Sequence, residues 1–218
     1  MKYRCETTSL EGFIQMLACN YLPHGYHFCV PGKIPEGKDP RVVDEKLIKR
    51  FQIDRSRAAR SRRKKAGYAN VHYLRFERFF VLLATAGEHW FFETEKVRIQ
   101  DLRRKPLRVA GFSVSFRGGH SHVRVAADVY AGLRAEADVV KTASDLEARL
   151  VPFAALGYAP VRRQLAAIIR RAERGSLCEN DSKRTPSKIV LPRRRTVSPF
   201  AKTASSLSSL NSDPLDLI

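Results

Sequence analysis

The chain has 218 residues, of which 40 are Lys or Arg and 22 are Asp or Glu, so its formal net charge is +18. No apolar run approaches the ~20 residues of a membrane-spanning helix, and the first residues do not lead into the apolar core of a signal peptide. We therefore expect no membrane partner. We expect a cytoplasmic protein, with association with the nucleoid as an open alternative, or a nuclear protein in a eukaryotic host.

The first predicted elements are a helix and a short strand. Thr8 and Glu11 fit a capping box that opens a helix ending near residue 20. Residues 25–30 have the composition of a strand, and the Pro and Gly residues of the 31–38 stretch predict a loop.

The next stretch, residues 41–65, carries eleven basic residues against three acidic ones, a local net charge of +8. Asp39 and Pro40 are typical of a helix start, and Asp54 and Gly67 predict the limits of a second helix. In that helix Ala58, Ala59 and Ala66 form a narrow apolar seam, and the remaining surface is cationic. The cationic side chains are those of Arg55, Arg57, Arg60, Arg62, Arg63, Lys64 and Lys65.

Seven like charges on one short segment repel each other, and a phosphate backbone supplies the missing counter-charge. The alternative is a charged face that only meets solvent. Charged faces that only meet solvent usually carry both positive and negative side chains. In this second helix the one acidic residue is its predicted cap, Asp54. Tyr68, His72 and Tyr73 follow closely, and their rings are suited to stacking on bases.

Residues 79–86 form a continuous apolar run that predicts a buried central strand. Residues 90–95 are predicted to be its antiparallel neighbour, and residues 97–102 to extend the sheet. Arg103 and Arg104 begin a second basic cluster.

Residues 107–125 predict a hairpin. The apolar positions change parity at Ala110-Gly111, which suggests a β-bulge, and Gly118-Gly119 predicts a two-residue turn. That turn fixes a register with an apolar face, in which Phe116 faces Ser121, Val114 faces Val123 and Phe112 faces Val125. The polar face then pairs Arg117 with His120, Ser115 with His122 and Ser113 with Arg124. This face suits phosphate contacts, and a simple solvent-facing surface is the alternative.

Three helices are predicted after the hairpin, over residues 126–141, from about 145 to 157, and from Pro160 onward. We expect them to cover one face of the sheet. From residue 176 the composition changes to Ser, Thr, Pro and basic residues, which predicts a disordered tail over 176–218. Its basic clusters also resemble a bipartite nuclear signal.

The fold expected overall is α+β. It is an antiparallel sheet of about five strands flanked by helices in a basic domain over residues 1–175, followed by the tail.

His120-Ser121-His122 resembles, over these few residues, the histidine pair of HUH nucleases, a family that includes rolling-circle initiators, relaxases and single-strand transposases. The resemblance implies a divalent metal on His120 and His122, with Tyr130 or Tyr158 as the nucleophile that attacks a DNA phosphodiester. Under this alternative the protein nicks or transfers strands in a replication or mobile-element system.

The leading hypothesis is a nucleic-acid-binding protein without catalysis, metal or cofactor. It grips the phosphate backbone with the seven cations of residues 55–65 and with Arg103, Arg104, Arg117 and Arg124. A third hypothesis is a basic adaptor for an acidic protein partner. DNA and RNA fit equally at this stage, and the oligomeric state is open.

Overall fold

The computed structural model describes residues 3–140, 142–176 and 191–201. A mixed sheet of five strands in the order β1-β3-β4-β2-β5 organises the first half of the chain. These strands are β1 (Glu6–Thr7), β2 (Phe28–Lys33), β3 (Val71–Phe76), β4 (Phe79–Ala84) and β5 (Gln100–Asp101). The α+β class and the central position of β4 are confirmed. The sheet is not purely antiparallel, however, because β1 runs parallel to β3.

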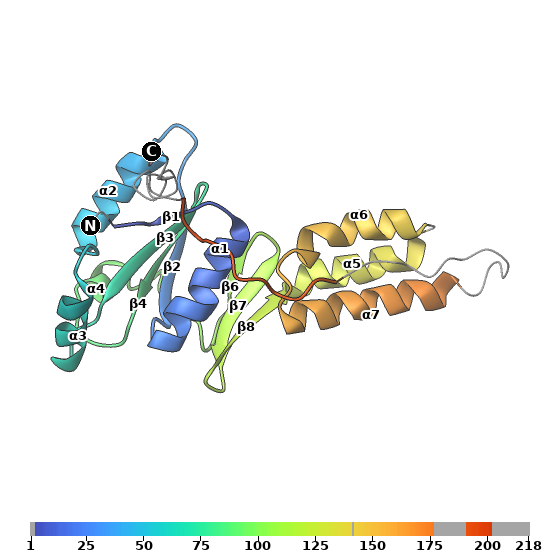
Figure 1. The fold of residues 1–218 in the computed structure, drawn as a ribbon. Coiled ribbons are helices and arrows are strands. Elements are labelled where there is room, and N and C mark those ends of the chain that lie inside the picture. The colour runs from blue at the N-terminus through green and yellow to red at the C-terminus, as the bar shows by residue number, and fades with distance from the viewer. Residues whose placement is uncertain (1–2, 141, 177–190, 202–218) are drawn as a thin grey trace, which may run out of the picture.

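Helices cover both faces of this sheet (Figure 1). Alternation along β4 explains the arrangement, because successive side chains of a strand point to opposite faces. Val81 and Leu83 join the core cluster that contains Phe13, and Leu82 joins the cluster that contains Phe51. The first face carries α1 (Leu10–Gln15), the π-helix η1 (Met16–Tyr21) and the 3-10 turn η2 (Leu22–His24). The second carries α2 (Pro40–Phe51) and α4 (Phe91–Thr94).

A second sheet holds β6 (Leu107–Val109), β7 (Phe112–Arg117) and β8 (His120–Val125). The register of β7 and β8 is the predicted one at all six pairs, from Phe112 opposite Val125 to Arg117 opposite His120. At Gly118 and Gly119 φ is 56° and 78°, values that glycine adopts readily in a two-residue turn. The sheet's apolar side chains belong to the same core cluster as Phe13.

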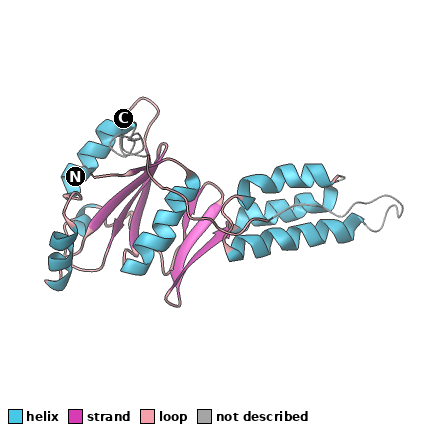
Figure 2. Ribbon diagram, viewed as in Figure 1, coloured by secondary structure: helices cyan, strands magenta, loops and turns pink. Residues whose placement is uncertain are grey.

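Three helices follow, α5 (Ala127–Val139), α6 (Ala143–Ala154) and α7 (Ala159–Ser176). They were expected to cover a face of the main sheet. They form instead a bundle beyond the second sheet, at the opposite end of the molecule from α3 (Arg57–Lys65) (Figures 1 and 2). Gln164 of α7 accepts from the Val125 N–H (2.9 Å) and donates to its carbonyl (3.2 Å). Within the described ranges, none of the helices has the length and apolar character to cross a membrane.

Two predictions about strands were wrong. Residues 90–95 contain α4, whose turn places Phe91 and Phe92 in the second core cluster. Residues 31–33 continue β2 and are not a loop. Pro31 is tolerated there because β5 pairs only with Phe28 and Cys29, which leaves β2 with a free edge further on.

Local signals for turns and caps were also misplaced. Ala110 (φ 45°) and Gly111 (φ 80°) form a tight two-residue turn between β6 and β7, not a bulge. α3 is capped by Ser56 and not by Asp54, because the Ser56 hydroxyl accepts the Ala59 N–H at 3.2 Å. Ser9 likewise caps α1 in place of Thr8, and α6 begins slightly earlier than expected, with Thr142 as its cap.

Residues 191–201 fall within the range predicted as a tail, yet they lie along the folded domain (Figure 1). The Arg194 N–H donates to the Gly157 carbonyl at 3.0 Å. The Gln15 amide exchanges two hydrogen bonds with the Val197 backbone, of 2.9 and 3.0 Å. A Cβ on Gly12 would lie 2.9 Å from Pro199 Cα, so glycine is required there. This segment therefore links α1 to the turn before α7. The rest of the predicted tail, 177–190 and 202–218, lies outside the described residues.

A buried ion pair connects α2 to the sheet. Arg75 of β3 is 2% exposed and donates from Nε and Nη2 to the carboxylate of Asp44, which is 6% exposed, with distances of 2.8 Å. The Tyr73 hydroxyl donates to the same carboxylate at 2.6 Å. Such a bidentate geometry offsets the cost of burying both charges, and neither partner tolerates the loss of the other.

We predict that Asp44→Asn destabilises the fold by about 3 kcal/mol, because it removes the buried counter-ion of Arg75 and leaves only the exposed Glu6 carboxylate nearby. The control is Glu6→Gln. Glu6 lies 3.3 Å from Arg75, but its carboxylate is largely exposed, so its loss is expected to cost under ~1 kcal/mol. Urea denaturation at neutral pH measures both, and equal losses would contradict the prediction.

His72 lies on β3 beneath a cage of tyrosine rings. The centroids of Tyr21 and Tyr26 are each 5.0 Å from the imidazole centroid. The Tyr3 hydroxyl lies 2.9 Å from His72 Nδ1 and also donates to the Tyr73 carbonyl at 2.7 Å. Burial, helped by the nearby Arg60 charge, lowers the pKa of His72 to about 3. His72 is therefore neutral in the folded protein at all moderate pH values.

This burial predicts a loss of stability in acid. In the unfolded chain His72 binds a proton below pH ~6.5, and the folded chain does not until about pH 3. Stability attributable to His72 is thus full above pH ~6.5 and falls with pH below it, by up to ~1.4 kcal/mol per pH unit. Urea unfolding at several pH values between 5 and 7 should show a shallower slope for His72→Phe than for the native chain. Identical slopes would refute this.

Candidate nucleic-acid interface

The basic helix α3 is held to the domain by its ends and its backbone. None of its residues is buried, and the predicted alanine seam is not a packing face, since Ala58 and Ala66 are exposed. The Asn70 amide donates to the Arg60 carbonyl at 2.9 Å. The Arg63 guanidinium donates to the Ala69 carbonyl at 3.4 Å. Hydrogen bonds therefore replace apolar contacts as the anchor of this helix.

The cations of residues 55–65 form a dense set without carboxylate partners. Among the described residues no carboxylate forms a salt bridge with any of these seven side chains, while six arginines elsewhere are paired. The paired arginines are Arg75, Arg98, Arg103, Arg108, Arg149 and Arg171, with distances of 2.5–3.3 Å. Arg57, Arg62, Lys64 and Lys65 are exposed, and Arg55, Arg60 and Arg63 are partly exposed. The positive charge predicted here is thus left for an external partner.

The arginines of the second predicted basic surface differ in whether a carboxylate compensates their charge. Arg103 forms a bidentate pair with Asp101, with distances of 2.8 and 2.9 Å, and this pair lowers the pKa of Asp101. Its charge is therefore largely compensated. Arg104, Arg117 and Arg124 are exposed. Arg117 and Arg124 lie on the β7–β8 hairpin, which Figure 1 shows apart from α3.

The candidate metal ligands lie on the β7–β8 hairpin, and the candidate nucleophiles lie outside it, Tyr130 on α5 and Tyr158 just before α7. His120 and His122 lie on its polar face, and His122 Nε2 is 3.3 Å from the Arg117 carbonyl. Ser121, on the other face, donates to the Ala18 carbonyl at 2.7 Å. Tyr130 and Tyr158 pack against the core on that apolar side, and burial raises the pKa of Tyr158. In the described part of the chain, no three His, Cys, Asp or Glu side chains gather to hold a metal.

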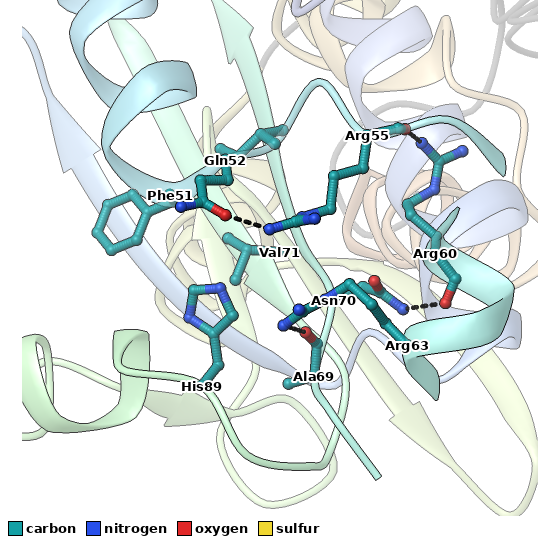
Figure 3. Close-up of a pocket in the computed structure, with 10 residues that line it drawn as sticks. Phe51, Gln52, Arg55, Arg60, Arg63, Ala69, Asn70, Val71 and His89 are labelled. Atoms are coloured by element: carbon teal, nitrogen blue, oxygen red, sulfur yellow. Dashed lines mark hydrogen bonds between the residues drawn. The ribbon is translucent and has the colours of Figure 1, made fainter. Parts of the chain in front are cut away.

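A groove that sequence reasoning missed runs beside α3 (Figure 3). Its narrow part is lined by the α2–α3 corner and by the start of β3, with Arg55, Arg60, Arg63, Asn70 and His89 around it. Its wider part opens between Tyr68 and Trp90. Of the predicted stacking rings, Tyr73 and His72 are buried, and Tyr68 is exposed. The sequence signal for the remainder was weak, because Asn70 and His89 come together only through the pairing of segments 67–70 and 85–88.

Neither comparison with known proteins identifies a family: no family model matches the chain, and no curated protein matches it. The case for function therefore rests on the residues of the site.

Because like charges on α3 repel each other, we predict that removing some of them raises the free energy of unfolding. Arg62 and Lys65 are three residues apart on one helix and both are exposed. Replacing both by Gln should stabilise the fold by up to ~0.5 kcal/mol at low salt, with the gain shrinking as salt screens the repulsion. Arg149→Gln with Arg171→Gln, which breaks two ion pairs, should bring no gain. Thermal unfolding at low and high salt measures both, and a loss of stability in the α3 variant would contradict the repulsion.

Proposed function

We propose that this protein binds nucleic acid by its phosphate backbone, with α3 and the preceding Arg55 as the principal contact. The observation that carries the proposal is the concentration of seven cations without carboxylate partners within residues 55–65. None of these cations forms a salt bridge among the described residues, while five exposed or partly exposed ion pairs compensate arginines elsewhere.

A helix of nine residues is about 13 Å long, a length along which a nucleic-acid strand presents several phosphates. The exposed cations Arg57, Arg62, Lys64 and Lys65 neutralise phosphates and release condensed counter-ions. Binding by this route is strong at low salt and carries no sequence information by itself. Arg117 and Arg124 on the hairpin offer a second contact for a longer strand.

The two alternatives predicted from the sequence are less well supported. The metal-dependent nicking hypothesis depends on His120 and His122 alone, because neither candidate tyrosine lies on their face of the hairpin. The adaptor hypothesis predicts binding to an acidic protein and none to nucleic acid, which the following experiment separates.

We predict that the affinity for a DNA or RNA oligonucleotide falls steeply with salt, by ~0.9 in log K per phosphate neutralised on a duplex. Changing Arg57, Arg62, Lys64 and Lys65 together to Gln should lower that slope by about 3 to 4. Fluorescence anisotropy over a salt series measures the slopes.

The matched control changes four paired arginines, Arg98, Arg108, Arg149 and Arg171, to Gln. It removes the same formal charge but should lower the slope by less than ~1. Equal effects would show that net charge, and not α3, drives binding. Absence of binding to every oligonucleotide at low salt would refute the proposal and leave the adaptor hypothesis.

A further inference from the structure

The groove beside α3 has a narrow and a wide part that share Gln52, Arg55, Arg63 and His89. In Figure 3 the Arg55 and Arg63 side chains both extend into the drawn pocket, Arg55 toward Gln52 and Arg63 toward Ala69. Arg55 donates to the Gln52 side chain and Arg63 to the Ala69 carbonyl. Each guanidinium has five N–H donors, so both retain donors for an anion that enters the groove.

Asn70 supplies an acceptor at the floor of the narrow part. Its side-chain N–H donates to the Arg60 carbonyl at 2.9 Å, which fixes the orientation of the amide. Its Oδ1 has no hydrogen-bond partner, although Asn70 is 5% exposed. A buried acceptor without a donor costs free energy, and a ligand N–H or O–H would satisfy it. The narrow part has no space for a water molecule in this structure, so the guanidiniums of Arg55 and Arg63 must move aside before a ligand reaches Asn70.

His89 supplies a neutral donor to the same groove. Its Nδ1 accepts the Phe91 N–H at 3.0 Å, so in the neutral ring the proton is on Nε2. Burial, and the charges of Arg63 and Arg55, lower its pKa. The groove therefore combines cationic donors, one neutral donor and one acceptor. A phosphate group alone would use the donors but not the acceptor.

Two exposed aromatic rings flank the wide part. Tyr68 is 45% exposed and Trp90 is 39% exposed. The Arg63 guanidinium lies 5.1 Å from the Tyr68 ring centroid. Phe51 stacks behind Trp90 with centroids 4.8 Å apart, so that ring is supported from behind. Glu88 and Glu93 also line this part, and their carboxylates disfavour a phosphate at that end while accepting the amino groups of a base.

We infer that this groove holds an unpaired nucleotide of a single strand, with its phosphate on Arg55 and Arg63 and its base against Trp90 or Tyr68. A donor on the base edge satisfies Asn70. The inference rests on the proposed nucleic-acid binding and deepens it. Stacking on aromatic rings needs an accessible base face, which a duplex does not offer. The protein should therefore bind single strands more tightly than duplexes. This preference adds to the general phosphate binding that α3 provides.

Trp90 is the one tryptophan of the chain, so its fluorescence reports on the groove directly. The experiment titrates the full chain with a short single-stranded DNA, its duplex and an abasic strand of the same length, at one salt concentration. Affinity is measured in parallel by anisotropy. We expect the single strand to quench Trp90 and to bind about tenfold more tightly than the abasic strand.

Tyr68→Leu and Trp90→Leu should each weaken binding of the normal strand about tenfold without weakening that of the abasic strand. Val139→Ala, an exposed apolar position on α5, is the control and should change neither. Asn70→Leu should also remove the difference in affinity between the normal and the abasic strand. If this buried substitution disturbs folding, the Tyr68 and Trp90 variants still test the inference.

Equal affinity for the normal and abasic strands, with Trp90 unquenched, would overturn the nucleotide groove and leave phosphate binding by α3 intact. Binding of no strand at low salt would overturn both proposals.

Discussion

The ion pair between Asp44 and Arg75 is the constraint on which the basic surface depends. It attaches α2 to β3 through two short hydrogen bonds between fully buried groups, and Tyr73 adds a third at 2.6 Å. α2 in turn ends at Gln52, whose left-handed backbone (φ 51°) turns the chain into α3. Because α3 has no buried residue of its own, its position is set by the elements before and after it. A pair of opposite charges inside the domain thus positions a set of like charges outside it.

Hydrogen bonds with a defined geometry, more than apolar area, orient the basic helix. The Ser56 cap, the Asn70 amide on the Arg60 carbonyl and the Tyr68 N–H on the Arg63 carbonyl hold its two ends. This anchor leaves exposed the faces that carry Arg57, Arg62, Lys64 and Lys65. A helix packed through an apolar stripe would instead place at least ~100° of its circumference against the domain. The unusual composition of residues 57–65 is therefore compatible with a defined position in the fold.

Sequence reasoning succeeded where a local rule determines the structure. The Gly118-Gly119 turn and the alternation of residues 112–125 determine the hairpin register residue by residue, and the apolar run at residues 79–86 predicts the central strand. It failed where long-range contacts decide. Trp90 to Glu95 have strand-forming residues, but burial of Phe91 and Phe92 in the second cluster favours a helical turn. The contacts of residues 191–201 with Gln15 and Gly157 join positions too far apart for any local pattern to reveal.

The candidate site was also predictable only in part, because a sequence shows the charges but not their partners. A sequence shows which residues are cationic, and it correctly marked residues 55–65 as a basic surface. It does not show which cations are already compensated, and Arg103, predicted as a contact, is held by Asp101 two residues away. Nor does it show that Asn70 lines one part of the groove beside Arg55 and Arg63 while Tyr68 and Trp90 line the adjoining part, since that depends on the pairing of residues near 68 and 88. In the proposed function the cations supply affinity for any polyanion, and the proposed nucleotide groove adds a preference for a ligand with an aromatic base and a donor edge.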